Sequence, residues 1–429
     1  MILLEVKSLS SFLTIIICML THSFPSYRIR KLRGVEAVQR PGQRNCMKMS
    51  TLLSMPFEEF SDSIGGSGRA KSFWKSIRSG EDPLERALPD GLSDRVKIII
   101  KDMLNGFPTI SSSVVTTETF SSCGTRKFLQ NLNDGLSIES VLIPAHKFGR
   151  TTLCVSTQVG CDRGCAFCAT GKMGLVRNLT ADEILSQVYH GLFIVSREKL
   201  PAMTNVVFMG MGDAGRNVGA VRSSVLALVD QNRFDMAQSK VTISTVGPSP
   251  ETFQMLADIP GTLAWSLHSP DDAIRKRLVP STKHSTIELR DGLGKALLSR
   301  ENVRKRTIMI ALTLIENIND SVEDAKKVAE FVRPLLAIAP KIALDLIPYN
   351  DISVSGFSRP SRERVGAFQQ VLREEGFFCS VRVTRGDEEA AACGMLATKR
   401  PKEYRPAWAT RVQGLTATVD ANAVTRVQI

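Results

Sequence analysis

The chain has 429 residues, of which 43% are hydrophobic and 23% charged. These values are ordinary for a soluble globular protein and exclude a fibrous, collagen-like or wholly disordered chain. The length allows one large domain with a smaller companion. The formal net charge of +12 is compatible with a polyanionic partner such as RNA, and equally with a solvated basic surface.

The N-terminal segment combines two kinds of targeting signal. Residues 12–20 form an apolar run that is shorter than the roughly 20 residues needed to span a bilayer and suits a signal peptide. Residues 23–50 hold seven Lys or Arg and one acid, as organelle transit peptides do. Together with Phe24 near the junction, this order resembles bipartite presequences of secondary plastids. We expect residues 1–50 to be a presequence and the location to be a plastid; a mitochondrion is the alternative, and the cytoplasm is disfavoured.

Residues 51–118 are predicted to form a small helical accessory domain. The stretches 68–80 and 92–106 place apolar residues at helical spacing. Residues 119–150 are predicted to be a hairpin and linker, because 128–144 contains two strand-like runs around Asn133, Asp134 and Gly135, which favour a turn.

Beyond Arg150 short apolar runs alternate with amphipathic helical patterns. Strands are predicted at 205–212, 240–247, 262–269, 307–315 and 343–350, and helices at about 180–197, 217–231, 285–299 and 320–336. Thr180 and Glu183 form a capping box at the start of the first helix. This alternation predicts an α/β fold with a parallel sheet, and we expect a partial or full (β/α) barrel over residues 151–396. Chemistry in such a barrel belongs at the C-terminal ends of the strands.

Four of the nine cysteines, Cys154, Cys161, Cys165 and Cys168, fall within fifteen residues. Three thiolates with the spacing of Cys161, Cys165 and Cys168 can hold three irons of a four-iron cluster. They leave the fourth iron open for a substrate. The pattern therefore predicts an enzyme that cleaves S-adenosylmethionine reductively to a radical. A structural zinc site, which needs four closed ligands, is the alternative, with Cys154 as the possible fourth.

The segment 154–188 closely resembles the RlmN/Cfr family of radical S-adenosylmethionine RNA methyltransferases, especially the RlmN branch that methylates carbon 2 of adenine. The resemblance covers about residues 55–400 and includes the motifs at 207–212, 241–247, 266–272, 346–350 and 384–396. It implies one [4Fe-4S] cluster held by Cys161, Cys165 and Cys168, and two S-adenosylmethionine molecules in each turnover.

The resemblance also implies a two-step reaction through a methylated cysteine. Cys393 matches the residue that accepts a methyl group, which a 5′-deoxyadenosyl radical then activates for addition to the base. Cys154 matches the cysteine that resolves the resulting protein–RNA adduct, and Glu139 matches the proton acceptor. Since Cys154 and Cys393 must meet, we expect the C-terminal segment to fold back over the mouth of the barrel.

Residues expected to bind S-adenosylmethionine follow from the same motifs, and each lies at the end of a predicted strand. They are Gly212, Asp213, Ser244, Ser266, Leu267, His268 and Asn350. One motif departs from the family, which has Gly-Glu-Pro where this chain has Gly212, Asp213 and Ala214. The carboxylate is kept on a shorter stem, which puts the contact with the ligand's ammonium group in doubt.

The resemblance therefore implies an adenine-C2 methyltransferase that acts on rRNA in the peptidyl transferase centre, with tRNA as a further candidate substrate. Two alternatives stay open: methylation at carbon 8 of the same base, and an RNA-binding assembly factor that lost catalysis through the change at Asp213 and Ala214. We expect a monomer with no stable membrane association that receives electrons from a flavodoxin or ferredoxin. Residues 397–429 match nothing assignable and are expected to be a basic tail.

Overall fold

The computed structural model describes residues 52–85, 92–104, 109–352, 355–383, 385–386 and 390–398. The predicted presequence, and all of the predicted tail except its first two residues, lie outside the described residues. Within these ranges no helix combines the length and the apolar character needed to cross a membrane.

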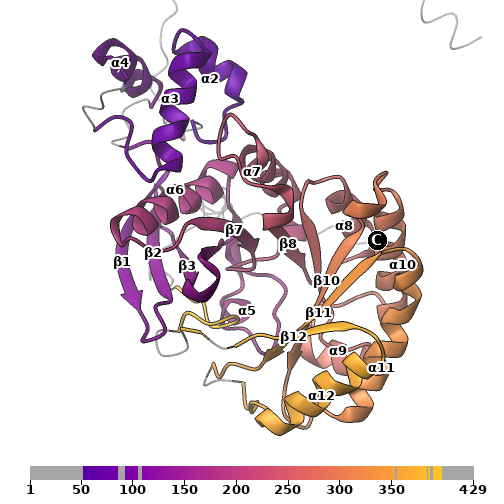
Figure 1. Cartoon of the computed structure of the whole chain (residues 1–429). Helices are drawn as coiled ribbons and strands as arrows, with labels where there is room; N and C mark the ends of the chain where they lie inside the picture. Colours follow the sequence, from indigo (N-terminus) through magenta and orange to yellow (C-terminus); the bar gives the residue numbers. More distant parts are fainter. Residues whose placement is uncertain are drawn as a thin grey trace, which may run out of the picture. The chain divides into compact units, whose positions relative to one another are not determined.

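A ten-stranded sheet forms the centre of the described chain (Figure 1). Its strands, in sheet order, are β1 (Ser113–Phe120), β2 (Arg126–Leu132), β3 (Ser137–Ala145), β4 (Arg150–Cys154), β7 (Met203–Phe208), β8 (Val241–Thr245), β9 (Thr262–Ser266), β10 (Thr307–Leu314), β11 (Lys341–Pro348) and β12 (Phe378–Val381). Strands β1 to β4 pair antiparallel, and β4 to β12 pair parallel. Since β1 and β12 are edges, the sheet is not closed, and the prediction of a partial barrel is confirmed.

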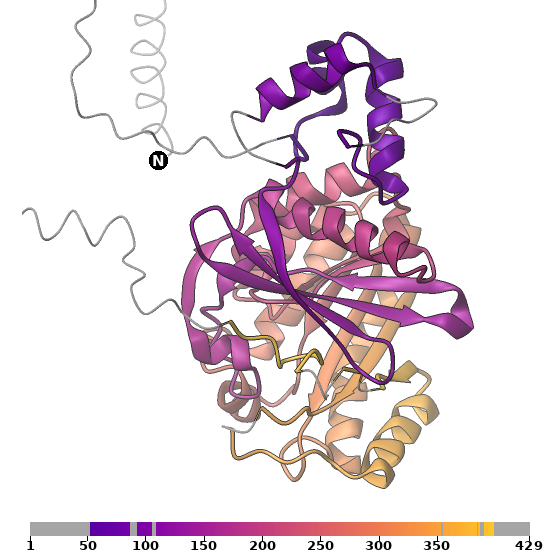
Figure 2. The same ribbon diagram turned by 90° about the vertical axis from the view of Figure 1, so that its left-hand side faces the viewer.

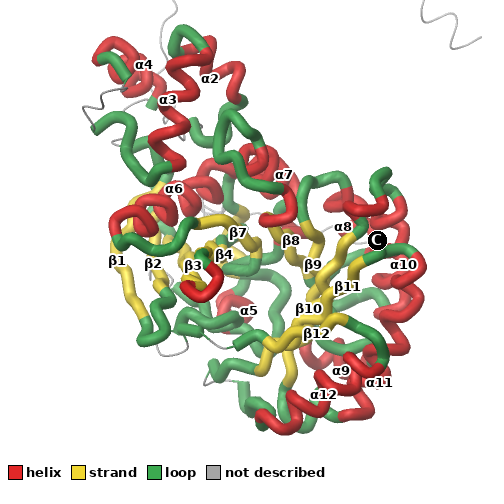
Figure 3. The backbone as a smooth tube through the Cα atoms, viewed as in Figure 1, coloured by secondary structure: helices red, strands yellow, loops and turns green. Residues whose placement is uncertain are grey.

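Helices connect the parallel strands and surround the sheet (Figures 1 and 3). They are α6 (Ala181–Arg197), α7 (Val218–Val229), α8 (Pro250–Ala257), α9 (Asp272–Leu278), α10 (Thr286–Leu298), α11 (Val322–Val332) and α12 (Arg362–Glu374). The parallel strands carry continuous apolar runs because both of their faces are covered; the consecutive residues Ile310, Ala311 and Leu312 of β10, which point to opposite faces, are all buried. The predicted capping box at Thr180 and Glu183 is confirmed.

Each predicted strand and helix beyond Arg150 is present, but several end earlier than expected. The strand predicted at 205–212 ends at Phe208, and the chain then turns. Gly210 lies so close to the backbone of Val155 in this turn that a side chain would not fit, and Gly212 has a φ of +98°. The helix predicted at 320–336 ends at Val332 and continues as a 3-10 helix, since Pro334 lacks an N–H donor.

The N-terminal helices are α2 (Phe57–Ser63), α3 (Ser67–Arg78) and α4 (Asp94–Met103). They confirm the helical patterns expected at 68–80 and 92–106. Helices were also expected up to about residue 116, but β1 already begins at Ser113. Its run of valines and threonines favours a strand, and it pairs with β2.

These helices are anchored to the rest of the sheet region. The ring centroid of Trp74 on α3 lies 5.1 Å from that of Phe234, a residue that follows α7. Arg78 donates a hydrogen bond to the carbonyl of Arg233, and the backbone N–H of Leu53 donates to Asp182 on α6 over 3.0 Å. Burial of Trp74, which is 0% exposed, stabilises this junction.

The hairpin expected around Asn133 to Gly135 is confirmed by the pairing of β2 with β3. Gly135 has a φ of +81°, the left-handed conformation that such a turn requires. Because β3 also pairs with β4, the hairpin continues the main sheet. The domain boundaries themselves stay predictions.

Candidate active site

The three cysteines of the spacing motif lie on one short loop after β4. The loop follows β5 (Gln158–Gly160) and leads into α5 (Ala169–Met173) and β6 (Leu175–Asn178), which pairs with β5. The N–H of Cys161 donates to the carbonyl of Gly174 over 3.1 Å, and that of Cys168 to the carbonyl of Cys165 over 3.1 Å. The backbone therefore fixes the positions of Cys161, Cys165 and Cys168.

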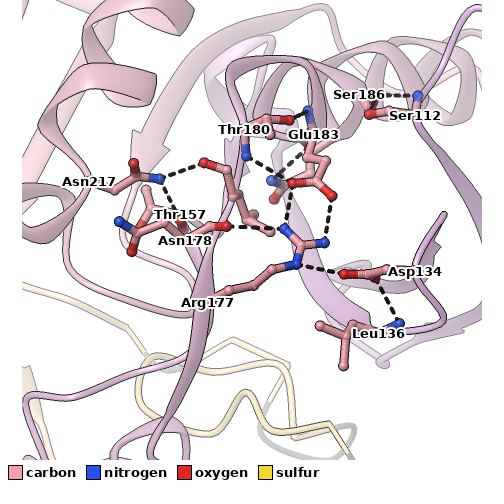
Figure 4. A network of polar contacts seen from close by, with 12 residues as sticks. Ser112, Asp134, Leu136, Thr157, Arg177, Asn178, Thr180, Glu183, Ser186 and Asn217 are labelled. Atoms are coloured by element: carbon pink, nitrogen blue, oxygen red, sulfur yellow. Dashed lines mark hydrogen bonds and ion pairs between the residues drawn. The ribbon is translucent and has the colours of Figure 1, made fainter. Parts of the chain in front are cut away.

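A polar network ties this loop to α6 and to the β2–β3 turn (Figure 4). Arg177 on β6 donates to both carboxylate oxygens of Glu183 over 2.8 and 2.7 Å, and to Asp134 over 2.7 Å. Asn217 donates to the carbonyls of Thr157 and Leu179 over 2.9 and 2.8 Å. Because Glu183 is almost fully buried, this bidentate pair is a rigid clamp beside the loop.

The three thiols fit a cluster better than a single metal ion. Burial raises the pKa of Cys161 to about 12 and that of Cys165 well above its usual value, and their neighbouring thiols add to the effect in both cases. Yet no three His, Cys, Asp or Glu side chains in the described ranges are placed to hold one metal ion. In a four-iron cluster each thiolate binds its own iron, so the sulfurs stay apart. Three thiols on one loop are the protein ligands that an open four-iron cluster needs, whereas a structural zinc site needs a fourth.

Cys154 ends β4, and Cys393 is the cysteine that acts on its pKa. Burial raises the pKa of the Cys154 thiol to about 12, and the charge of Cys393 raises it further. Cys393 also acts on the pKa of Cys168. The side chain of Cys393 is exposed. Gly394, the residue after Cys393, accepts a hydrogen bond from Ala169 at the end of the cysteine loop, and Cys393 acts electrostatically on both Cys154 and Cys168. The structure thus brings Cys393 close to both.

The C-terminal segment that carries Cys393 folds back across the sheet, as predicted (Figure 2). Asn350, at the end of β11, donates to the carbonyl of Cys393 over 3.0 Å. The N–H of Ala169 donates to the carbonyl of Gly394 over 2.7 Å, and Arg385 donates to Pro144 on β3 over 2.6 Å. These contacts join the segment to β11, to the end of the cysteine loop and to β3.

Ser244, Ser266 and Leu267 lie together at the ends of neighbouring strands. The hydroxyl oxygens of Ser244 and Ser266 are 3.3 Å apart. The carbonyls of Ser266 and Leu267 both accept hydrogen bonds from Arg275 on α9. Arg275 is fully buried and also binds the carbonyl of Val246. Sequence analysis did not select Arg275, because its role in joining the ends of β8 and β9 depends on its burial.

His268 follows β9 in a left-handed conformation with a φ of +64°, which costs a non-glycine residue about 1 kcal/mol or more. Its Nδ1 accepts a hydrogen bond from the N–H of Thr313 over 3.1 Å. Burial lowers the pKa of His268 to about 3, so the ring is neutral and Nε2 carries its proton. The ring packs on Phe167 in the cysteine loop, with centroids 4.6 Å apart.

Comparison with known proteins identifies the family of this chain. A model of the Radical SAM superfamily matches residues 155–328. The crystal structure of a radical SAM methyltransferase from Sphaerobacter thermophilus matches with a TM-score of 0.70 at 32% identity, over 80% of this chain and 98% of that one. The dual-specificity RNA methyltransferase RlmN of Saccharophagus degradans is 35% identical over 382 residues, 86% of this chain and 92% of the relative. The chain belongs to the RlmN family.

The cofactors expected from the cysteine spacing, a [4Fe-4S] cluster and S-adenosylmethionine, are those of the radical SAM superfamily to which RlmN proteins belong. Cys161, Cys165 and Cys168 would hold the cluster, which supplies the electron for cleavage. Gly212, Ser244, Ser266, Leu267, His268 and Asn350 lie around the same strand ends, and their contacts to S-adenosylmethionine stay predictions.

This RlmN-family chain departs from the Gly-Glu-Pro pattern at Asp213. The carboxylate of Asp213 is bonded to neighbouring groups of the protein itself. One carboxylate oxygen accepts from the hydroxyl of Thr245 over 2.7 Å and from the N–H of Gly215 over 2.8 Å. The other accepts from the N–H of Val246 over 2.7 Å. Only 4% of Asp213 is exposed. The shorter side chain thus joins the ends of β7 and β8, and its expected contact with the ligand's ammonium group has to compete with three internal hydrogen bonds.

Glu139 lies on β3 of the RlmN-family sheet and is buried, whereas an isolated glutamate in a hairpin is usually solvated. Its carboxylate is 3.1 Å from Nζ of Lys127 and accepts from the N–H of Ala397 over 2.9 Å. Burial raises the pKa of Glu139, and Lys127 opposes that shift. Glu139 therefore holds the segment just beyond Cys393; its role as proton acceptor stays a prediction.

Arg382 is a residue of this RlmN-family site that the sequence did not reveal. It directly follows β12, forms an ion pair with Asp345 on β11, and has both Nη atoms 3.8 Å from the sulfur of Met209. The charges of Cys154 and Cys393 both act on its guanidinium. An arginine at a strand end is usually solvated, so only its position eleven residues before Cys393 could have drawn attention to it.

Proposed function

We propose that this chain methylates carbon 2 of an adenine in RNA through a methylated cysteine. The observation that carries the proposal is that Cys393 lies close to the cysteine loop, with Gly394 bonded to Ala169, and acts electrostatically on both Cys154 and Cys168. Carbon 2 lies between two ring nitrogens and is electron-poor, so it offers no nucleophile to an electrophilic methyl group. A carbon radical can add at that position.

When bound, the [4Fe-4S] cluster supplies the electron that cleaves S-adenosylmethionine and generates a carbon radical. Cys393 carries the methyl group, and its exposed side chain can reach both the cluster side and an incoming base. Release of the product requires the thiolate of Cys154 to attack the sulfur of Cys393, so that the sulfur–carbon bond breaks as the disulfide forms. The released carbon takes up a proton to complete the methyl group, and the one surplus electron of the radical adduct passes to a one-electron acceptor, for which the oxidised iron–sulfur centre is suited. An external thiol reductant then restores both thiols. Glu139, held beside the same segment, would accept the proton from carbon 2.

The name of the relative, a dual-specificity RNA methyltransferase, supports an RNA substrate for this chain. Large-subunit rRNA is the proposed substrate, with tRNA as the second. The base must be unstacked for carbon 2 to be reached, so flipped or single-stranded adenines are the accessible ones. We also propose that the protein acts as a monomer and that a flavodoxin or ferredoxin donates the electron.

The proposed plastid location is supported by the apolar run at 12–20 and the Arg-rich, acid-poor stretch that follows it. A reducing compartment also protects thiolate-bound iron from oxidation. Import of a labelled chain into isolated plastids and mitochondria tests this location, and uptake by mitochondria alone contradicts it.

The activity is tested by reconstituting the full chain anaerobically and digesting RNA after turnover with S-adenosylmethionine and a strong reductant. Mass spectrometry is expected to detect 2-methyladenosine. Detection of 8-methyladenosine would support the alternative position instead. Absence of any cleavage of S-adenosylmethionine would favour an assembly factor in which the change at Asp213 and Ala214 abolished catalysis.

A further inference from the structure

The end of the sheet opposite the cysteines carries two cavities lined by cations. The first, of about 440 Å³, is lined by Lys71, Lys75 and Arg78 of α3, with Ser72, Gln231 and Asn232. The second, of about 760 Å³, lies where β8 to β11 begin and is lined by Arg300, Arg304, Lys305 and Lys341 among others. We call these two cavities and the α7–β8 connection between them the basal face.

The α7–β8 connection borders both cavities, since Gln231 and Asn232 line the first and Gln238 and Ser239 the second. It is held rigidly in place. Trp74 packs against Phe234, and Arg233 donates to the carbonyl of Met55 over 3.1 Å. The contacts of this connection therefore hold the cations of the first cavity in position relative to those of the second.

The charge of the basal face is strongly one-sided. Seven cations line the two cavities, against Asp258 and Glu301. Asp258 is already paired with Arg222 over 2.6 Å, and no carboxylate lines the first cavity. Lys71, Lys75, Arg304, Lys305 and Lys341 are exposed.

Arg300 adds a fixed positive charge to the second cavity. Only 8% of it is exposed, and its guanidinium donates to three neutral carbonyls, those of Ala257, Gly261 and Lys305, over 2.8, 3.2 and 2.7 Å. These partners hold the guanidinium in place without cancelling its charge.

We propose that the basal face binds the phosphate backbone of the RNA substrate, away from the reacting base. Lysine, arginine, amide and hydroxyl groups are the donors that proteins use for phosphates. The inference rests on the proposed RNA substrate. An acidic electron donor is the less suitable partner, because electrons must reach the cysteine loop at the other end of the strands. With eight residues in β10, the two ends are about 25 Å apart, so an RNA must extend around the protein by at least that length to contact both.

The test compares RNA binding by the full-length protein and two charge-reversed variants, Lys71→Glu with Lys75→Glu and Arg304→Glu with Lys305→Glu. Lys326→Glu with Lys327→Glu on α11 is the matched control, because it makes the same charge change at exposed positions of a different surface. Filter binding at several salt concentrations measures the dissociation constant for a large rRNA domain and for a short stem-loop. Thermal melts confirm that all variants are folded.

Each basal variant is expected to weaken binding of the large RNA about tenfold and to reduce the salt slope by about 1.5, as loss of two phosphate contacts predicts. Stem-loop binding and RNA-independent cleavage of S-adenosylmethionine are expected to stay unchanged. Wild-type behaviour of both variants, or equal weakening by the control, or equal weakening for both RNAs, would overturn the inference. Failure of the wild-type chain to methylate any RNA would instead count against the proposed function, and RNA binding would still test the basal face.

Discussion

Asn350 donates its side-chain amide hydrogen to the backbone carbonyl of Cys393 over 3.0 Å. This single contact connects the end of β11 to the residue proposed to carry the methyl group. It positions the cysteine through its backbone and leaves the thiol unconstrained. The account therefore assigns Asn350 a positioning role besides its expected contact with S-adenosylmethionine.

Replacing Asn350 with Ala is expected to slow methylation of Cys393 about five- to tenfold, which corresponds to the net worth of one hydrogen bond of about 1 kcal/mol. Peptide mass spectrometry of Cys393 during turnover measures this rate. Gln370→Ala, a change of an exposed amide on α12, is the control. Normal methylation in the Asn350 variant would show that the segment is held without this contact.

Asp213→Ala removes the acceptor for three buried donors, on Thr245, Gly215 and Val246. We expect it to lower the free energy of unfolding by about 2–4 kcal/mol, because buried donors without partners lose their solvation. Denaturant unfolding of the cofactor-free chain measures this loss. An unchanged stability together with lost binding of S-adenosylmethionine would mean that Asp213 acts mainly on the ligand.

Arg382→Met is expected to destabilise the chain by about 2 kcal/mol, since it leaves the buried carboxylate of Asp345 without its ion-pair partner. Adding Asp345→Asn should restore most of the stability. If Arg382 acts on the paired cysteines, the double variant stays slow in RNA methylation although it is stable. Full recovery of turnover in the double variant would reduce Arg382 to a structural role.

His190 on α6 provides a test of stability against pH that is independent of the site. Its Nε2 lies 3.0 Å from the carbonyl of Ser113, and burial lowers its pKa from 6.5 to about 4, although Glu118 opposes the shift. The unfolded chain therefore binds a proton that the folded chain excludes. Stability is complete above pH 6.5 and falls between pH 6.5 and 4, by no more than about 3 kcal/mol.

Unfolding at several pH values should show this loss in the wild type and a smaller one in His190→Gln. His146→Gln, at an exposed position, is the control and is expected to keep the wild-type profile. An identical profile in all three proteins would contradict the assignment to His190.

The alternation of strands and helices was predictable because buried parallel strands carry runs such as residues 307–314, which no other arrangement satisfies as well. Local signals also helped: the capping box at Thr180 correctly predicted where helix α6 begins. The strand ends were less predictable, since the turn at Gly210 depends on contact with Val155, which is distant in sequence.

The site residues were predictable only where a local sequence motif identifies them. The spacing of Cys161, Cys165 and Cys168 indicated a cluster by itself, whereas Cys154 and Cys393 depended on the resemblance to the RlmN/Cfr family. The direction of the Asp213 carboxylate and the position of Arg382 depend on tertiary neighbours, Thr245 and Asp345. No local pattern encodes such contacts.

The central claim is that the methyl group reaches RNA through Cys393 as a carbon radical. The most direct test is anaerobic turnover with S-adenosylmethionine whose methyl group carries three deuterium atoms, followed by mass spectrometry of the digested RNA. Removal of one deuterium before addition predicts 2-methyladenosine with two deuterium atoms, and no product from Cys393→Ala. A product that keeps all three deuterium atoms, or one formed without Cys393, would contradict the account.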